Sequence, residues 1–351
     1  MKRIKIGNKE LFNYSEPYII AEIGANHNGD MKLALEMIDL AKDAGADAIK
    51  FQSWQPGSIN SAENYKKHLK YTDSPKKHFG SLYEMDVKYH LSFDQHAELK
   101  TYCDEKDIAF CSTPFTSMEA DMLRNLDVSF VKIASMDINN IQLLSYVADM
   151  GLPIVLSTGM STMAEIERAI GIIEEVGNKQ IILLHCISIY PPEYEDIHLR
   201  NILMLQKAFP YPVGFSDHSI GTSVPIASVA FGACIIEKHF TLDKSLPGWD
   251  HAISADPKEL REIIVESRNI HKALGNFQRT VSEAEIEKKS KFRRSLVLTR
   301  DAKAGEILIE SDLASKRPGS GIQADEIQYV IGRKLLRDIS ADEHLSWEDL
   351  V

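Results

Sequence analysis

The sequence has 351 residues, with 40 Lys and Arg against 51 Asp and Glu, so its formal net charge is −11. A chain of this length that is 44% hydrophobic can bury a large core, which excludes a disordered scaffold. The acidic balance, without a broad basic field, argues against nucleic acid or an anionic membrane surface as the main partner.

The first 17 residues carry charges but no apolar core with a small-residue cleavage site, and no stretch approaches the roughly 18 apolar residues of a membrane span. We therefore expect a cytoplasmic protein with no membrane partner. Cysteines stand at Cys103, Cys111, Cys186 and Cys234 without CxxC spacing, and three lie in apolar runs. They are predicted to be reduced thiols in the core.

Eight short apolar runs alternate with helical patterns between residues 18 and 274, which is typical of βα units around a parallel sheet. Amphipathic segments at 31–45, 93–106, 163–177 and 257–275 predict helices between and after the strands. The predicted strands are 18–23, 48–52, 109–113, 130–134, 153–157, 181–185, 213–216 and 235–239.

Eight such pairs in about 260 residues predict a (β/α)8 TIM barrel. The alternative is a doubly wound open sheet, but the EIGANHNG segment after the first strand is not the GxGxxG turn that this fold needs. A long insertion at 53–92 between the second strand and its helix is typical of an active-site loop.

The pattern changes after the segment 282–294 to short strands and turns without long helices, which indicates a second domain. The segments 301–313 and 338–350 share six of 13 positions at an offset of 37 residues, and predict a pseudo-symmetric β module. We therefore predict a barrel domain over 1–281, a solvated basic linker over 282–294 and a small domain over 295–351.

Polar side chains end all eight predicted strands. Because active sites of (β/α)8 barrels lie at the carboxyl ends of the strands, these side chains are expected around one mouth. A purely structural barrel has no need for such a ring. The strand ends carry Glu22, Lys50 and Gln52, Thr113, Lys132 and Ser135, Ser157 and Thr158, His185 and Ser188, Ser216 and His218, and Glu237 and His239.

Two lysines and a ring of hydroxyls suit a small phosphorylated anion, since lysine supplies charge and serine or threonine supplies directed donors. The predicted phosphate and carboxylate cradle is Lys50, Thr113, Lys132, Ser135, Ser157 and Ser216. Taken singly, each of these residues could instead be a strand-end cap or a lysine reaching solvent.

His218 and His239 end successive strands and could bind one divalent ion with open positions for a substrate carbonyl. The alternative is that both imidazoles are satisfied by backbone hydrogen bonds. Glu22 and Glu237 face the same mouth as candidates for general acid or base chemistry. Their alternative is salt bridging to Lys50 and Lys238.

The chain resembles the sialic acid synthases, which condense phosphoenolpyruvate with an N-acylated amino sugar aldehyde to a nonulosonic acid. The resemblance runs nearly end to end. Its motifs are EIGANHNG, AGADAIKFQ, STPF, VKIAS, LSTGM, LHCISIYPPEYEDIHL, VGFSDHSIG, GACIIEKHFTLDK, PGWDHAIS and KRPGSG. It implies that the small domain is an antifreeze-protein-like (SAF, β-clip) module and that the enzyme is a domain-swapped homodimer.

The resemblance also implies roles for single residues. Glu22 corresponds to the catalytic carboxylate, with Glu237 and Asp137 as further catalytic candidates, and His218 and His239 correspond to ligands of Mn²⁺, or of Mg²⁺ or Co²⁺ as alternatives. Phosphoenolpyruvate contacts are implied for Lys50, Thr113, Lys132, Ser135, Ser157, Ser188 and Ser216, and sugar contacts for Gln52, Tyr190, Asp250 and Arg317, the last reaching the neighbouring subunit.

At three positions the chain differs from the pattern of the family it resembles, and these differences bear on which acceptor sugar binds. Ser188 stands where N-acetylneuraminate synthases often have Asn, Asp137 where Glu is common, and Trp249 where Pro is more usual. The candidate acceptors are N-acetylmannosamine, a 2,4-diacetamido-trideoxyhexose leading to legionaminic or pseudaminic acid, a 6-phosphorylated mannosamine, and mannose. A Schiff-base pyruvate aldolase using Lys132 and a sugar-binding protein without turnover are the more distant alternatives.

Overall fold

The computed structural model describes residues 2–70 and 80–351, which form two compact units, Met1–Gly275 (unit 1) and Asn276–Val351 (unit 2). Within the described residues, no helix is long and apolar enough to cross a membrane. The domain boundaries predicted at residues 281 and 294 stay a prediction.

Unit 1 is a nearly closed barrel of eight parallel strands in the order β5-β4-β3-β10-β9-β8-β7-β6, with β5 and β6 side by side at the seam. This confirms the predicted (β/α)8 fold and all eight strands, and the alternative of a doubly wound sheet is wrong. The strands are β3 (Tyr18–Gly24), β4 (Ala48–Ser53), β5 (Ala109–Pro114), β6 (Val131–Ile133), β7 (Ile154–Ser157), β8 (Ile181–Cys186), β9 (Val213–Asp217) and β10 (Ile235–His239).

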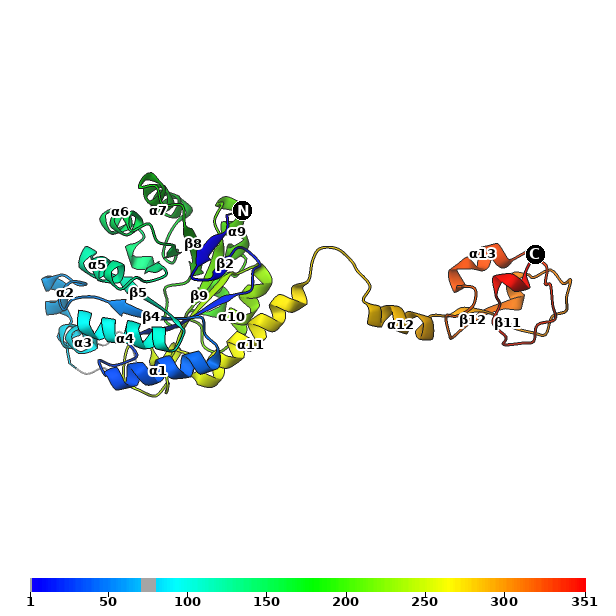
Figure 1. The fold of residues 1–351 in the computed structure, drawn as a ribbon, viewed down its shortest axis with the longest axis horizontal. Helices are drawn as coiled ribbons and strands as arrows, with labels where there is room; N and C mark the ends of the chain where they lie inside the picture. The colour runs from blue at the N-terminus through cyan, green and yellow to red at the C-terminus, as the bar shows by residue number, and fades with distance from the viewer. Residues whose placement is uncertain (1, 71–79) are drawn as a thin grey trace. The chain divides into compact units, whose positions relative to one another are not determined.

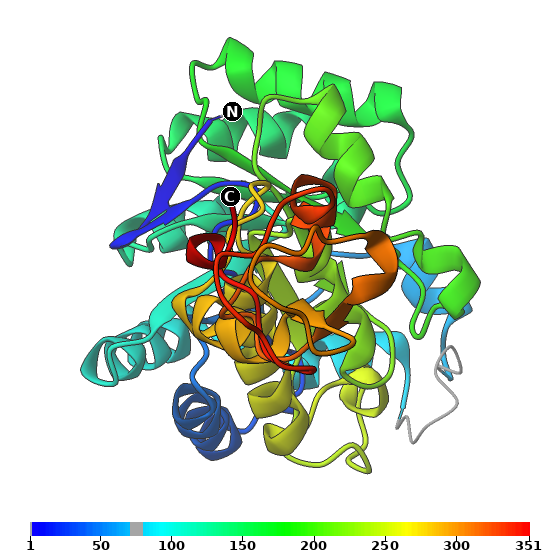
Figure 2. The same cartoon turned by 90° about the vertical axis from the view of Figure 1, so that its right-hand side faces the viewer.

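The helices of unit 1 lie around the strands (Figure 1), and Figure 2 shows the same arrangement from the side. Most begin at a Ser, Thr, Asp or Asn whose side chain accepts a backbone N–H of the first turn, as Asp30 does for α1. The helices are α1 (Met31–Ala44), α2 (Ala62–Lys67), α3 (Leu82–Tyr89), α4 (Phe93–Glu105), α5 (Ser117–Asn125), η1 (Ser135–Asp137), α6 (Ile141–Asp149), α7 (Met163–Glu175), α8 (Tyr194–Ile197), α9 (Asn201–Ala208), α10 (Ser223–Ser228), η2 (Val229–Phe231), η3 (His251–Ile253) and α11 (Pro257–Leu274).

Two apolar layers hold the barrel together. Alternate side chains of each strand point outward, where they meet the helices in the larger core, or inward, where Ile20, Phe130 and Ile182 fill the barrel. The hairpin of β1 (Ile4–Ile6) and β2 (Lys9–Leu11) contributes to the inner core and so plugs the amino-terminal end. The candidate site is therefore expected at the opposite end of the barrel, where the strands end in polar side chains.

The predicted insertion at 53–92 contains α2 and α3, and its residues 71–79 lie outside the described part of the chain. The described part packs on a small apolar cluster of its own, in which Trp54, Met85 and Tyr89 are buried. Trp54 Nε1 donates to the backbone oxygen of Asp86 at 3.1 Å, which ties the start of the insertion to α3.

Unit 2 confirms the predicted internal repeat at the level of side-chain contacts. Arg300 donates to Glu306 and Asp312 at 2.9 and 2.8 Å, and 37 residues later Arg337 donates to Glu343 and Asp349 at 2.7 and 2.6 Å. The elements of unit 2 are α12 (Glu283–Phe292), which occupies the predicted linker, β11 (Ser295–Leu298), η4 (Glu310–Asp312), β12 (Leu313–Lys316), η5 (Ala324–Glu326), α13 (Ile327–Val330) and η6 (Trp347–Asp349).

Candidate active site

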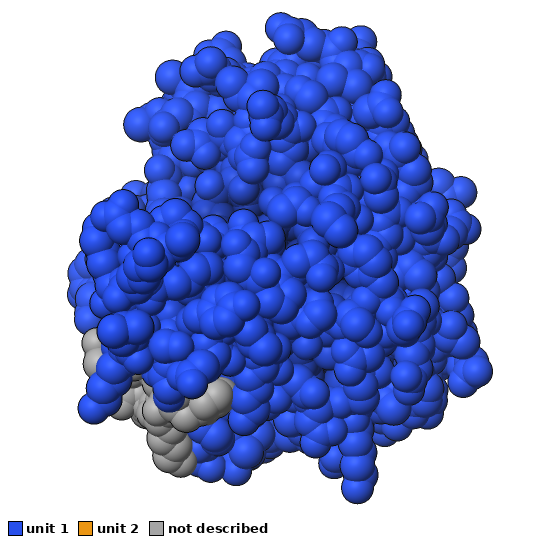
Figure 3. All heavy atoms as spheres, turned by 90° about the vertical axis from the view of Figure 1, so that its left-hand side faces the viewer, with its two compact units in different colours: residues 1–275 blue, residues 276–351 orange. Residues whose placement is uncertain are grey.

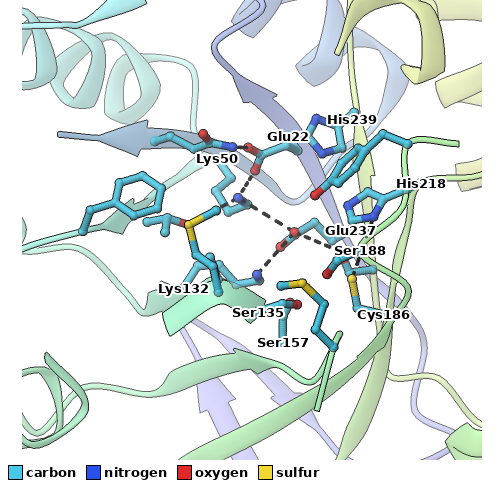
Figure 4. Close-up of a pocket in the computed structure, with 18 residues that line it drawn as sticks. Glu22, Lys50, Lys132, Ser135, Ser157, Cys186, Ser188, His218, Glu237 and His239 are labelled. Atoms are coloured by element: carbon cyan, nitrogen blue, oxygen red, sulfur yellow. Dashed lines mark hydrogen bonds and ion pairs between the residues drawn. The ribbon is translucent and has the colours of Figure 1, made fainter. Parts of the chain in front are cut away.

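The carboxyl ends of the barrel strands surround a cavity of about 280 Å³, here called the anion cavity. Figure 3 shows unit 1 from the side of α2 and α3, with a hollow near the centre of that face, and Figure 4 shows the cavity in close-up. The strand register places neighbouring polar residues level with one another, as in Glu22 opposite Lys50 and Ser216 opposite Glu237. The lining residues are Glu22, Lys50, Gln52, Thr113, Phe115, Lys132, Ala134, Ser135, Met136, Ser157, Met160, Cys186, Ser188, Tyr190, Ser216, His218, Glu237 and His239.

Two lysines and two glutamates form a buried charge cluster at the floor of the anion cavity (Figure 4). Lys50 forms an ion pair with Glu22, and its Nζ lies 3.8 Å from Glu237 Oε1. Lys132 Nζ lies 3.6 Å from the same Glu237 oxygen. Glu237 is thus shared between both ammonium groups, whereas Glu22 has one.

This asymmetry shifts the pKa values of the two carboxyl groups in opposite directions. Burial raises the pKa of Glu22 to about 7, although the Lys50 ammonium opposes the shift. Burial also raises the pKa of Glu237, but Lys132 and Lys50 outweigh it and the net pKa is lowered. Glu22 therefore exchanges a proton near neutral pH while Glu237 stays ionised, which is the pattern of a proton carrier beside a fixed anion.

Hydroxyl groups face the lysines across the anion cavity. Lys50 Nζ donates to Thr113 Oγ1 at 3.4 Å, and Ser216 Oγ donates to Glu237 at 3.2 Å. The Ser157 hydroxyl is buried and has no hydrogen-bond partner in the described structure. Because a buried donor without a partner is costly, this hydroxyl indicates a place for a ligand oxygen.

Gly159 keeps the rim of the cavity open. Its N–H donates to Ser135 Oγ at 3.1 Å, and a Cβ at this position would lie 2.4 Å from Ser188 Oγ and 2.8 Å from Ser135 Oγ. We expect Gly159→Ala to displace both hydroxyls and lower kcat/KM by about 10²-fold, since a misplacement of about 1 Å can cost that much in rate. Steady-state kinetics measures this.

Gly171 is the matched control, because it lies inside α7 with no atom within 4 Å of an added Cβ. Gly171→Ala should leave the kinetics unchanged and stabilise the helix by roughly 1 kcal/mol. A Gly159→Ala enzyme with wild-type kcat/KM would remove Ser135 and Ser188 from the substrate site.

Two histidines stand at the edge of the cavity with ring centroids 5.3 Å apart. His218 Nδ1 lies 2.7 Å from the backbone oxygen of Ile187, which makes Nδ1 the donor of this hydrogen bond. His239 Nδ1 is buried without a hydrogen-bond partner, 3.7 Å from an Asp250 carboxylate oxygen. Burial, then the neighbouring cations, lower the pKa of His239 well below its ordinary value, so this imidazole is neutral.

These residues fit a divalent cation held by two imidazole nitrogens, with oxygen ligands completing the shell. In residues 2–70 and 80–351, no three His, Cys, Asp or Glu side chains are grouped so as to hold an ion by themselves. Positions for substrate or water oxygens are therefore part of any such site.

A second cavity of about 520 Å³, here called the acceptor cavity, adjoins the first. The two share Gln52, Phe115, Met136, Ser188, Tyr190 and His239. Gln52 Nε2 donates to Glu22 at 2.9 Å, and the Tyr190 ring stacks on His218 at 4.1 Å between centroids, so both residues lie at the junction. The residues that line only the acceptor cavity are Ile59, Asn60, Leu82, Asp86, Ile189, Trp249 and Asp250.

Two of the residues given a catalytic, substrate-binding or metal role from the sequence lie outside both cavities. Asp137 belongs to η1, and its carboxylate accepts from Asn140 at 3.1 Å. Arg317 belongs to unit 2, where its guanidinium lies 5.2 Å from the Phe292 ring centre. All the other residues given such a role line one cavity or both, whereas Thr158 and His185 of the predicted strand-end ring line neither.

Cys186 lines the anion cavity, although its apolar run predicts a thiol in the core. His185 is predicted at the mouth, but its Nε2 lies 2.6 Å from the backbone oxygen of Ile197, on the outer side of β8. Adjacent residues of a strand face opposite sides, so Cys186 faces inward. The alternation of inward and outward side chains along β8 is the sequence signal that identifies Cys186, and not His185, as the inward residue. All four cysteines are buried and unbridged.

Comparison with known proteins assigns relatives to both parts of the chain. Residues 37–279 match the NeuB family and residues 293–351 match the SAF domain. The chain is 38% identical to the N,N'-diacetyllegionaminic acid synthase of Legionella pneumophila, over 95% of this chain and 94% of that protein. It is 34% identical to the pseudaminic acid synthase of Helicobacter pylori, over 95% of this chain and 98% of that protein.

A solved structure extends the likeness to three dimensions. The N-acetylneuraminic acid (sialic acid) synthetase of Leptospira borgpetersenii, in complex with citrate, superposes with a TM-score of 0.74 at 38% identity. The match covers 82% of this chain and 95% of that chain.

Proposed function

Because this chain belongs to the NeuB family of sugar acid synthases, we propose that it condenses phosphoenolpyruvate with an N-acylated amino sugar aldehyde, giving a nonulosonic acid and phosphate. The observation that carries the proposal is a cavity with two lysines and a ring of hydroxyls that opens into a second cavity, with Glu22 beside the junction. Each cavity would hold one substrate.

Phosphoenolpyruvate is proposed to occupy the anion cavity. Lys50 and Lys132 would neutralise its phosphate and carboxylate, while the hydroxyls of Thr113, Ser157 and Ser216 supply directed donors. The unpartnered hydroxyl of Ser157 supports this placement. Held in this way, the enol presents one face of its C3 carbon to the acceptor cavity, and much of the catalysis would be positioning.

The acceptor aldehyde would lie at the junction, beside His218, His239 and Gln52. The two histidines would hold a divalent cation, Mn²⁺ in the first place and Mg²⁺ or Co²⁺ as alternatives, which as a Lewis acid polarises a carbonyl. Tyr190, stacked on His218, would keep the ring in place and shield this end of the cavity from water.

In the proposed reaction C3 of phosphoenolpyruvate forms a bond to the aldehyde carbon, the π electrons of the carbonyl move to the aldehyde oxygen, and this oxygen takes up a proton. Water adds to C2 and gives up one proton, which balances the proton taken up by the aldehyde oxygen. The C2 hydroxyl gives up its remaining proton as the bond between C2 and the phosphate oxygen breaks, which leaves a keto group at C2 and inorganic phosphate. Glu22 would accept the proton of the adding water, since its pKa of about 7 suits transfer at neutral pH. Glu237 stays ionised and holds the two ammonium groups in place.

The proposed assembly is a cytoplasmic, domain-swapped homodimer in which Arg317 of one copy reaches the acceptor bound by the other. The resemblance of the KRPGSG segment supports this role.

Phosphate release from phosphoenolpyruvate tests the proposal. It should require Mn²⁺, stop on addition of a chelator, and require one of N-acetylmannosamine, 2,4-diacetamido-2,4,6-trideoxymannose, N-acetylmannosamine 6-phosphate or mannose. Product mass identifies the new acid. If folded protein releases no phosphate with any of the four sugars, the synthase proposal fails.

A further inference from the structure

The acceptor cavity has apolar side chains in the part that is not shared with the anion cavity. At the junction the shared residues are both polar, as Gln52 and His239 are, and apolar, as Phe115 and Met136 are. The part that is not shared contains four apolar side chains, here called the apolar wall, beside three polar ones; they are Ile59, Leu82, Ile189 and Trp249, and Asn60, Asp86 and Asp250. The far end of a bound acceptor therefore meets the apolar wall together with polar groups.

Trp249 is held in this wall by aromatic contacts. Its ring lies 5.0 Å from the Tyr89 ring at 81° and 6.2 Å from the Trp54 ring at 42°. Trp54 and Tyr89 are buried, and with Met85 they form the small apolar cluster under the insertion, against which Ile59 also packs. The indole therefore rests on a packed base rather than on a free loop.

The loop that carries Trp249 is anchored on both sides. Gly248 has φ +155° and no room for a side chain, because a Cβ would lie 2.6 Å from the His251 ring. After Trp249, the Asp250 carboxylate lies 3.7 Å from His239 Nδ1. Trp249 thus precedes Asp250 in the chain and lines the acceptor cavity but not the anion cavity.

The charges of the distal part point in the same direction. Asp86 Oδ2 accepts from the Gly57 N–H at 2.8 Å and from the Tyr65 hydroxyl at 2.5 Å, which holds its carboxylate in place. Asp250 adds a second carboxyl group. Among the described residues that line this cavity, none is Lys or Arg. Among these described residues of one copy, a phosphate on the acceptor would find carboxylates and no cationic side chain.

We infer that Trp249 is a specificity-determining residue, and that it selects an uncharged acceptor with apolar substituents on its distal carbons, of the 2,4-diacetamido-2,4,6-trideoxyhexose class. This inference rests on the proposed function. The acetamido methyl at C4 and the methyl at C6 bury against the indole, Ile59 and Leu82. N-Acetylmannosamine places hydroxyls there instead of methyl groups, and so buries less apolar surface against the indole.

The test compares kcat/KM at saturating phosphoenolpyruvate for three acceptors, 2,4-diacetamido-2,4,6-trideoxymannose, N-acetylmannosamine and its 6-phosphate. The wild type should prefer the first by more than about tenfold, since a single methyl group in an apolar pocket is worth about tenfold or more. Trp249→Ala should reduce that preference at least tenfold through the KM of the acceptor, with the KM for phosphoenolpyruvate unchanged. Trp249→Phe keeps an aromatic ring beside Tyr89, so its preference should lie between that of the wild type and that of Trp249→Ala.

Trp347→Phe is the matched control, because Trp347 lies in unit 2 and is 42% exposed; its preference should equal that of the wild type. If the wild type prefers N-acetylmannosamine or the 6-phosphate, or if Trp249→Ala and Trp249→Phe keep the preference, the inference fails while the synthase function stands. If no acceptor releases phosphate, both the function and the inference fail.

Discussion

Glu22→Gln is expected to lower kcat for phosphate release by about 10²- to 10⁴-fold, the range for loss of a general base. Glutamine keeps the size of the side chain and the acceptor oxygen for the Gln52 amide, 2.9 Å away, but cannot take a proton. Binding of phosphoenolpyruvate, measured by calorimetry, should change far less than kcat, since the lysines and hydroxyls of the anion cavity remain.

The pH profile gives an independent readout of the same residue. A base must be ionised, and burial raises the pKa of Glu22 to about 7. The wild-type kcat/KM should therefore fall about tenfold per pH unit as the pH drops below 7. The residual activity of Glu22→Gln should lack this limb and show only the ionisation of the substrate.

Glu36→Gln is the control for a glutamate replaced on an exposed face, because Glu36 lies on the solvent side of α1. Its rate and its pH profile should equal those of the wild type. If the Glu22→Gln enzyme keeps more than a tenth of the wild-type kcat, a group other than Glu22 accepts the proton.

Lys238→Met is expected to destabilise unit 1 by about 3–5 kcal/mol, the cost of leaving one partner of a buried ion pair without the other. Lys238 Nζ lies 2.7 Å from Asp217 Oδ2, and both side chains are 1% exposed. Lys238 also donates to the backbone oxygen of Ser219, while Asp217 accepts the Ser219 N–H at 3.0 Å. Removal of the Lys238 ammonium leaves the Asp217 carboxylate buried without its ion-pair partner.

Urea unfolding followed by tryptophan fluorescence measures this loss. In a Trp347→Phe background only Trp54 and Trp249 remain, and both belong to unit 1. The double variant Asp217→Leu/Lys238→Met removes both charges and should recover most of the stability, because a buried pair replaced by apolar groups is often neutral.

Lys67→Met removes the exposed partner of Glu63 and should leave the unfolding midpoint unchanged. A Lys238→Met protein as stable as the Lys67→Met control would contradict the prediction. The pair also bears on the site, since Asp217 precedes His218 and Lys238 precedes His239. A loosened pair should lower activity even in the folded fraction.

Most of the barrel and much of its site could be predicted from the sequence. The spacing of apolar runs predicted all eight strands, because each strand is buried on both faces and each helix has an apolar stripe. Since all parallel strands end at the same face, Lys50, Thr113, Lys132 and Ser216 could be placed together without knowledge of their distances. The motif resemblance extended the predicted set to Tyr190 and Asp250.

The pairing of particular side chains was decided only by the tertiary structure. Strand register put Cys186 rather than His185 in the cavity and set Lys238 against Asp217 rather than against a glutamate. The turn of η1 took Asp137 away from the cavities.

Trp249 could be suspected from the sequence as a border of the sugar pocket, but its support by Trp54 and Tyr89, more than 150 residues earlier, could not. The physical reason is one of range. Periodicity and strand ends are local properties of the chain, whereas the face a residue presents within a strand depends on register, and the contacts of a loop depend on which distant segments pack beneath it.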